Sequence, residues 1–436
     1  MAYVIGLLVL LVGLLASIAL HEVGHMVPAK RFGVRVSMYM VGFGPTLWSR
    51  VRGETEYGIK AVPLGGYVRL VGMYPPADVV GAKPRPGRLG ELVDAAREMS
   101  AEEVRPGEEH RAFYRLSAPK KVVVMLGGPV MNLVIAVVLL AVVMVGFGLP
   151  TGISTTIGAV GECVLPADAA AGTACTADDP ATPAAAAGLE VGDTLVSYGG
   201  AAIATWADFQ AAIKATDGGD IPLVVERDGE QVTLSVSPVT ADRPVLDADG
   251  AVVLDDAGDV VTAPARYLGV SPTAALERQP VSAVPAAVWS GVAGTAAVVV
   301  TLPARMVDVV QAILGNEQRD ATSVVGVVGI GRFAGEIAAS DAGIVAQVQG
   351  MLSLLASLNI ALFVFNLIPL LPLDGGHVAG ALWEGAKRQV ARVRGLPRPA
   401  PADVARMVPL AYGVFVLLAV MGVLLIYADV VAPVTL

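Results

Sequence analysis

Four stretches of the chain carry no charged residue and are long enough to cross a lipid bilayer as helices. A spanning helix needs about 20 mostly apolar residues. The four stretches are Ala2–Leu20, Val122–Pro150, Leu352–Leu373 and Val408–Tyr427. A fifth uncharged stretch, Val281–Pro303, contains two prolines and two glycines, and we expect a surface or re-entrant helix there. The first stretch lacks the basic start of a secretory signal peptide, so we interpret it as a span.

Between the first two spans the pattern changes from continuous to alternating. Val34–Met73 alternates apolar and polar residues and is broken by glycines, which predicts two or more β-hairpins. Tyr74–Arg111 is rich in proline and charge, and we expect a loop with one short helix around Leu89–Met99.

Composition and charge agree with a membrane protein and give its orientation. Of 436 residues, 55% are hydrophobic and only 16% are charged, against about a quarter charged in soluble chains. Sixteen of the 30 lysines and arginines lie between the first two spans, eight lie in the 200 residues from 148 to 347, and six lie between the last two spans. Basic loops stay in the cytoplasm, so both chain ends are expected outside. No basic patch interleaved with aromatic residues suggests nucleic acid.

The outward region between the second and third spans reads as a compact domain from about Thr155 to Val239. A Gly-Leu-Glu-Val-Gly-Asp segment ending at Asp193 leads into a strand, a Gly-Gly turn, a helix at Trp206–Lys214, and a hairpin of Pro222–Glu226 with Gln231–Val236. This order resembles a PDZ domain, which holds an extended peptide as an added strand; an inert β-rich spacer is the alternative.

The two cysteines of the chain, Cys163 and Cys175, lie in this outward region. Disulfides persist outside the cytoplasm, so we expect a small staple rather than a metal site.

The clearest chemical motif follows the first span directly. His21-Glu22-Val23-Gly24-His25 places two imidazoles four residues apart on one helical face, where they can bind one zinc ion, and Glu22 can take a proton from water. Ionisable groups at membrane depth are costly and usually functional.

A catalytic zinc site needs a third protein ligand, and residues near His25 do not supply one. Asp374 is the best candidate, because it follows two prolines, Pro369 and Pro372, that must break the end of the third span. His377 ranks below it, with a helix-cap or supporting role expected.

Two asparagines of the third span, Asn359 and Asn366, share a helical face. Either could donate a hydrogen bond to a substrate backbone, and Asn366 is placed to stabilise an oxyanion. Contact between helices is the alternative role for both.

Together these motifs resemble the site-2 protease family, and more narrowly bacterial intramembrane proteases that cleave anti-sigma factors. The resemblance rests on H-E-x-x-H after the first span, NLIPLLPLDGG after the third, a PDZ-like domain between, and the segments GFGPTLW, PLGGYVRL and GGPVMN. It implies a zinc metalloendopeptidase with one Zn²⁺ held by His21, His25 and Asp374.

The resemblance also implies that Glu22 is the general base and that Asn366 assists the oxyanion. Gly42, Phe43 and Gly44 match a membrane-dipping hairpin that holds the substrate, and Asn359 is a further candidate for substrate binding. The expected substrates are single-span membrane proteins of the anti-sigma-factor type, already cut once outside the membrane. In this chain the prolines lie three and six residues after Asn366, where some relatives have three and five, and one PDZ-like domain is present where some have two.

The predicted fold is an α-helical polytopic membrane protein of about four transmembrane helices, with a membrane-associated β-hairpin region and an inserted α+β PDZ-like domain, in a bacterial inner membrane. A catalytically inactive scaffold and a metal transporter are the alternatives from other classes. The predicted segments are 1–29 (first span), 30–73 (hairpins), 74–118 (cytoplasmic loop), 119–150 (second span), 151–275 (PDZ-like domain), 276–346 (outward linker with an amphipathic or re-entrant helix), 347–376 (third span), 377–405 (cytoplasmic loop) and 406–430 (fourth span).

Overall fold

The computed structural model describes residues 1–83, 86–166, 173–176, 179–245, 260–315, 319, 323–340 and 342–434. These residues form two compact units, and each is described by itself. The first unit combines Met1–Gly146 with Pro280–Leu436, and the second is Phe147–Gln279.

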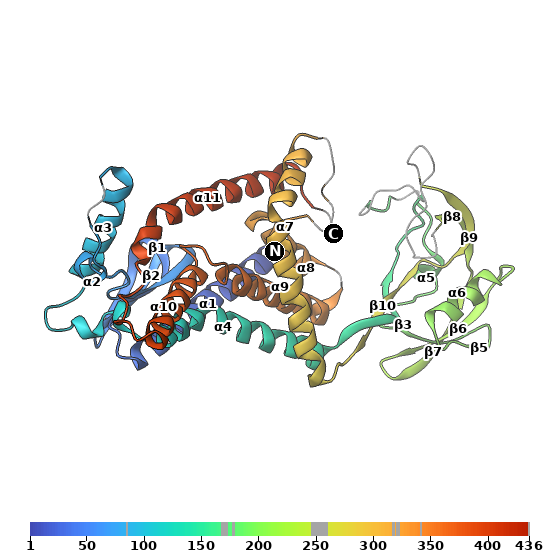
Figure 1. The fold of residues 1–436 in the computed structure, drawn as a ribbon. Coiled ribbons are helices and arrows are strands. Elements are labelled where there is room, and N and C mark those ends of the chain that lie inside the picture. Colours follow the sequence, from blue (N-terminus) through green and yellow to red (C-terminus); the bar gives the residue numbers. More distant parts are fainter. Residues whose placement is uncertain are drawn as a thin grey trace. The chain divides into compact units, whose positions relative to one another are not determined.

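The first unit is a helical bundle with one β-hairpin (Figure 1). Its described helices are α1 (Ala2–Arg31), α2 (Ala77–Val80), α3 (Arg88–Glu102), α4 (Ala118–Ala141, continued by a π-helical segment Val142–Phe147), α7 (Val284–Ile313), α8 (Val327–Ala339), α9 (Gly343–Asn366), α10 (Asp374–Val393) and α11 (Val408–Val431). Its strands are β1 (Val36–Arg52) and β2 (Thr55–Leu70).

Helices α1, α4 and α9 pack side by side, and small residues let them come close. A Cβ atom on Gly24 of α1 would collide with the backbone of Gly127 on α4, and one on Gly13 would lie 2.8 Å from the Leu355 side chain of α9. Membrane helices associate through such small-residue contacts, because lipid offers no hydrophobic drive between them. The ends of α1 and α4 that carry His25 and Gly127 are thereby brought together.

Five described helices are long and apolar enough to cross a membrane, one more than the four predicted spans. The additional helix is α7, which forms one continuous helix where we expected a surface or re-entrant segment. It runs across α4 and α9 rather than alongside them (Figure 1). A helix that crosses the others at the end of the bundle is consistent with the surface or re-entrant position that we expected. Four spans therefore remain our prediction.

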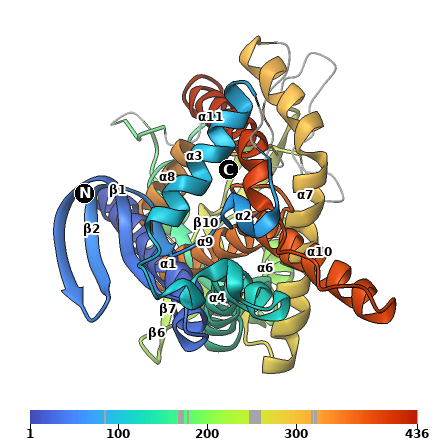
Figure 2. The same ribbon diagram turned by 60° about the vertical axis from the view of Figure 1, so that its left-hand side comes forward.

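The β1–β2 hairpin curves alongside α1 (Figure 2). Its strands are long and bent, so that β2 pairs with both edges of the first half of β1. Tyr39 of β1, for example, pairs with Tyr57 near the start of β2 and with Val68 near its end. The β-structure expected within residues 34–73 is thus confirmed, but the number was wrong: one long hairpin folds back on itself where two or more hairpins were predicted. Its last segment, Gly66–Leu70, lies next to the helix that carries His21.

The connections between the spans are more helical than predicted. The short helix expected around Leu89–Met99 is confirmed as α3, and Arg97 on it pairs with Asp403 at 2.7 Å, just before α11. The predicted loop 377–405 instead begins inside α10, a 20-residue helix that starts at Asp374.

The second unit is an antiparallel sheet with a short covering helix. Its elements are β3 (Leu149–Val160), α5 (Pro183–Ala186), β4 (Thr194–Tyr198), β5 (Ala201–Ala202), α6 (Trp206–Lys214), β6 (Ile221–Arg227), β7 (Glu230–Val236), β8 (Val239–Pro244), β9 (Thr262–Tyr267) and β10 (Val270–Glu277). The main sheet has the order β10-β3-β4-β6-β7, with β5 on β4, and β8 pairs with β9.

The sequence pattern explains the core of this unit. Thr205 caps α6 and Asp208 completes its capping box, while Trp206 and Phe209 face a core with Leu223. The predicted helix and hairpin are confirmed, and a disulfide joins Cys163 to Cys175. Assignment of this unit as a PDZ domain stays a prediction.

Candidate metal centre

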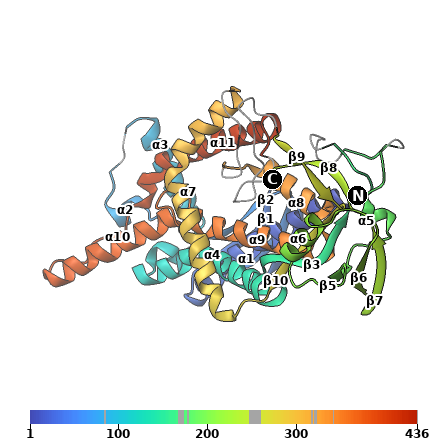
Figure 3. The ribbon, with the colours of Figure 1, turned by 90° about the vertical axis from the view of Figure 1, so that its right-hand side faces the viewer.

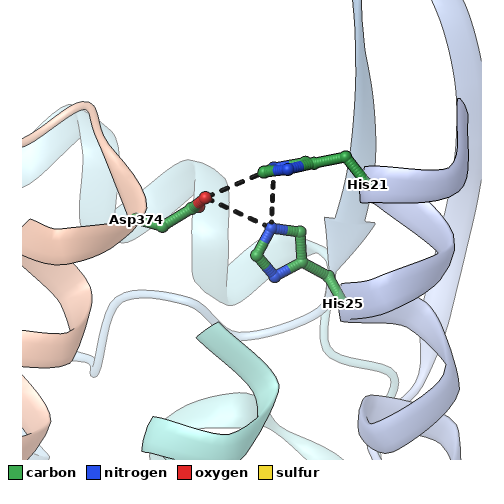
Figure 4. Close-up of side chains that lie close together, drawn as sticks. All are labelled: His21, His25 and Asp374. Atoms are coloured by element: carbon green, nitrogen blue, oxygen red, sulfur yellow. Dashed lines mark hydrogen bonds and ion pairs between the residues drawn. The ribbon is translucent and has the colours of Figure 1, made fainter. Parts of the chain in front are cut away.

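Two histidines of α1 point to one side of that helix because they lie one turn apart (Figure 4). His21 and His25 are buried, with 9% and 3% of their surfaces exposed, and their Nε2 atoms lie 3.1 Å apart. Two buried nitrogens this close need either a proton on one of them or a metal ion bound to both, because two lone pairs would repel. The pair can serve as half of a metal site.

Asp374 reaches the histidines because α9 stops eight residues earlier. The α9 helix ends at Asn366, and the proline-containing turn that follows reverses into α10, whose first residue is Asp374. The next residue but one, Gly376, has no space for a side chain, since a Cβ there would lie 2.6 Å from the backbone nitrogen of Leu371. The glycine therefore lets the turn pack tightly enough to present the carboxylate.

The three side chains form a triangle that fits a tetrahedral zinc ion. Oδ2 of Asp374 lies 3.3 Å from Nε2 of His21 and 3.3 Å from Nε2 of His25. Zinc–ligand bonds of about 2.0–2.2 Å at tetrahedral angles put ligand atoms about 3.3 Å apart. The Asp374 oxygen is buried without a hydrogen-bond partner, as a metal ligand would be. Among described residues, this is the only group of three or more His, Cys, Asp or Glu side chains that meets the geometry for a metal ion.

Helix α4 holds the far side of both imidazoles. Nδ1 of His25 lies 2.8 Å from the carbonyl oxygen of Val124 and donates to it, which leaves Nε2 free to bind a metal. The amide of Asn132 lies 3.1 Å from Nδ1 of His21. Its Oδ1 has no partner in the structure, and turning the amide over places that oxygen where it accepts the His21 N–H.

Val124 and Asn132 were not identified as site residues from the sequence. The segment GGPVMN, residues 127–132, contributed only to the family resemblance. A buried asparagine ten residues into an otherwise apolar span was the available signal.

A cavity of about 830 Å³ opens onto the three candidate ligands. Its lining includes the general-base candidate Glu22 and the oxyanion candidate Asn366. The remaining lining residues are Gly66, Tyr67, Val68, Arg69, Leu70, Met73, Tyr74, Ala96, Met99, Ser100, Glu103, Met125, Pro372, His377, Val408, Ala411, Tyr412 and Phe415. The end of β2 and the start of α11 thus form parts of its wall.

The other predicted substrate residues lie outside this lining. Gly42, Phe43 and Gly44 belong to β1, and Phe43 stacks on the cavity residue Tyr67 with ring centres 6.1 Å apart. Asn359 is fully buried and donates to Ser17 of α1 at 3.0 Å. Asn359 therefore makes a contact between helices, which is the alternative role expected from the sequence.

Comparison with known proteins gives the family. Residues 9–397 match peptidase family M50. The chain is 34% identical to the zinc metalloprotease Rip1 of Mycobacterium tuberculosis over the full length of both chains. It is 28% identical to the metalloprotease MmpA of Caulobacter vibrioides, over 89% of each chain. It is also 25% identical to the zinc metalloprotease RasP of Oceanobacillus iheyensis, over 54% of this chain and 62% of RasP. The chain therefore belongs to peptidase family M50, the site-2 protease family, and is a multi-pass membrane zinc metalloprotease that performs intramembrane proteolysis.

Proposed function

We propose that this protease cuts single-span membrane proteins of the anti-sigma-factor type, in or beside the bilayer, with one zinc ion held by His21, His25 and Asp374. The observation that carries the ligand assignment is the triangle of 3.1, 3.3 and 3.3 Å between their ligand atoms. Zinc, when bound, polarises the scissile carbonyl and acidifies water. Two buried histidines and a carboxylate leave the fourth tetrahedral position for water or substrate.

The residues around the triangle have separate roles. Glu22 lines the same cavity and takes the proton of the attacking water, which it then passes to the leaving amine. Asn366 lines the cavity next to the turn that presents Asp374, and it donates a hydrogen bond to the developing oxyanion. Both act on a substrate that must be extended, because a helix hides its peptide bonds.

The end of β2 offers a place for such a strand. Gly66–Leu70 pairs with β1 on one side, no other described strand pairs with it, and five consecutive residues of it line the cavity. A substrate segment that adds to this edge would be held by backbone hydrogen bonds beside Glu22. Gly42, Phe43 and Gly44 would support this edge from β1, through the Phe43–Tyr67 stack.

We place the enzyme in a bacterial inner membrane with both chain ends outside the cytoplasm. The distribution of lysine and arginine supports this orientation. The second unit would then face outward, where its disulfide persists, and would restrict entry to substrates shortened by an earlier cut.

The central experiment compares cleavage of a tagged single-span anti-sigma substrate, truncated outside the membrane, by the purified wild type, Glu22→Gln and Glu98→Gln. Glu98 is an exposed residue of α3, so it controls for the chemical change alone. We expect zinc in all three and cleavage by the wild type and Glu98→Gln only. Cleavage by Glu22→Gln at the wild-type rate would refute the assignment of Glu22 as the general base. Absence of zinc from the wild type would refute the ligand set.

A second experiment tests the outward unit. Leu149 and Glu277 pair at the base of β3 and β10, so residues 150–276 can be replaced by a short Gly-Ser linker without separating the chain ends. The shortened enzyme should cleave full-length substrates that the wild type spares. Unchanged selectivity would refute the restriction.

A further inference from the structure

One face of α10 is apolar and exposed, and no described part of the chain covers it. Leu382, Trp383, Val390 and Val393 lie on this face, with 59%, 64%, 49% and 76% of their surfaces exposed. Spacings of seven from Trp383 to Val390, three from Val390 to Val393 and eleven from Leu382 to Val393 bring them onto one side of a helix. We call these four residues the apolar stripe of α10. A contiguous apolar stripe on a helix marks a binding surface.

The opposite face of α10 is fixed to α4 by a buried ion pair. Glu384, with 1% of its surface exposed, accepts from Lys121 at 2.8 Å and pairs with Arg388 at 2.6 Å. Gly385 of α10 also comes close to Ala118, at the start of α4. The apolar stripe therefore points away from the bundle.

This contact fixes the depth at which α10 lies. Lys121 is the last charged residue before the uncharged stretch Val122–Pro150 of the second span. Its partner Glu384 must lie level with it, at the boundary between headgroups and hydrocarbon. Figure 1 views α10 nearly end-on, whereas Figure 3, turned by 90°, shows it lengthwise and projecting beyond the bundle. The helix therefore lies across the bundle, as an interfacial helix does.

Basic residues border the apolar stripe on both sides. At 100° per residue, Lys387 and Arg394 fall along one edge and Arg392 along the other. No acidic residue occurs between Glu384 and Asp403. We propose that α10 is a membrane-surface anchor that binds anionic phospholipid, with the apolar stripe in the headgroup–acyl boundary and these three residues at the phosphates.

Charge selects lipid over a second copy of the chain as the occupant. Two stripes facing each other would bring the basic edges together without any carboxylate to pair with them. An anionic bilayer surface instead attracts each lysine or arginine, favouring binding about fivefold per residue. The proposal concerns a surface outside the cavity and does not depend on the substrate.

The test uses the full chain with one fluorescent reporter. The two cysteines are bonded to each other, so Val393→Cys supplies a single free thiol for an environment-sensitive NBD label. The labelled protein is placed, one copy per disc, in nanodiscs of phosphatidylcholine alone or mixed with phosphatidylglycerol. We expect the emission to shift to shorter wavelength with phosphatidylglycerol, and added salt to reverse the shift by screening.

Matched charge variants locate the effect. Lys387→Gln/Arg394→Gln should remove most of the phosphatidylglycerol-dependent shift, whereas Arg50→Gln/Arg52→Gln, which removes two charges from the hairpin, should leave it. Equal emission in both kinds of disc, or a shift that survives the α10 variant, would overturn the proposal. A shift that follows the number of protein copies per disc, without phosphatidylglycerol, would assign the stripe to a second copy and would also overturn it.

Discussion

Gly128 occupies a position of α4 where a side chain would enter the candidate metal centre. A Cβ on Gly128 would lie 2.7 Å from Nε2 of His21 and closer still to Nε2 of His25. Gly128→Ala therefore pushes one methyl group between the two ligand nitrogens. We expect the variant to fold and to lose its zinc.

The magnitude follows from the geometry. Non-bonded atoms reach their optimal separation at about 3.5 Å, so Nε2 of His21 must retreat by about 0.8 Å. Zinc ligands tolerate deviations of about 0.2 Å, and the retreat exceeds this four times over. Losing contacts that only support a ligand costs about 10–100-fold in metal affinity. Displacing ligands themselves should cost at least about 100-fold, or about 2.7 kcal/mol.

The assay is zinc content of the purified protein across a series of chelator concentrations, with thermal unfolding in detergent as the folding control. Gly413→Ala is the matched variant, because Gly413 lies exposed on α11 and a Cβ there meets nothing within 4 Å. It should keep wild-type zinc affinity. Wild-type zinc affinity in Gly128→Ala would refute the reasoning, because the methyl group and the metal cannot share this space.

Three further outcomes follow from contacts described above. Asn132→Ala should weaken zinc binding about 10–100-fold by releasing His21, measured by the same chelator competition; unchanged affinity would contradict the amide contact. Arg227 donates to Asp193 at 2.7 Å and holds the pKa of Asp193 below its usual value. That contribution to stability is present above the ordinary pKa of 3.8 and is lost as pH falls through the lowered one, so Arg227→Gln should flatten the acid limb of the unfolding profile, and an unaltered limb would contradict this. Lys121→Met should destabilise the chain by about 1.5–3 kcal/mol, because it removes a charge-assisted hydrogen bond from buried Glu384, which keeps Arg388 as its counterion. Adding Glu384→Leu should restore most of the loss; a double variant as unstable as the single one in thermal unfolding would contradict the pairing.

The parts of the site that could be predicted from sequence are those that depend on local chain geometry. His21 and His25 share a face because of the helical repeat alone. Asp374 was identifiable because two prolines must end the third span before it, and the structure brings its carboxylate to both imidazoles. In the second unit, α6 and the β6–β7 hairpin have capping and turn signals within a few residues of each element.

The contacts that escaped prediction join segments far apart in sequence. Asn132 meets His21 only because glycines let α1 and α4 approach at one level, and no periodic pattern encodes that register. Likewise, β10 joins the sheet of the second unit by pairing with β3 across more than a hundred residues. The α10 helix was not predicted, because the charged residues in this part of the sequence are typical of a loop. The apolar stripe between those charges repeats with a helical period and was the signal for a helix.

The proposed metal ligands lie far apart in the sequence, and this has a consequence for the synthesis of the protein. His25 leaves the ribosome about 350 residues before Asp374, so a partly made chain holds two imidazoles and no complete metal centre. With these ligands, zinc would bind fully only after α9 and the start of α10 have been made, and its binding would then close a loop of about 350 residues. Until Asp374 has been made, the nascent chain lacks one of the three proposed ligands, so we expect no proteolytic activity from it up to that point.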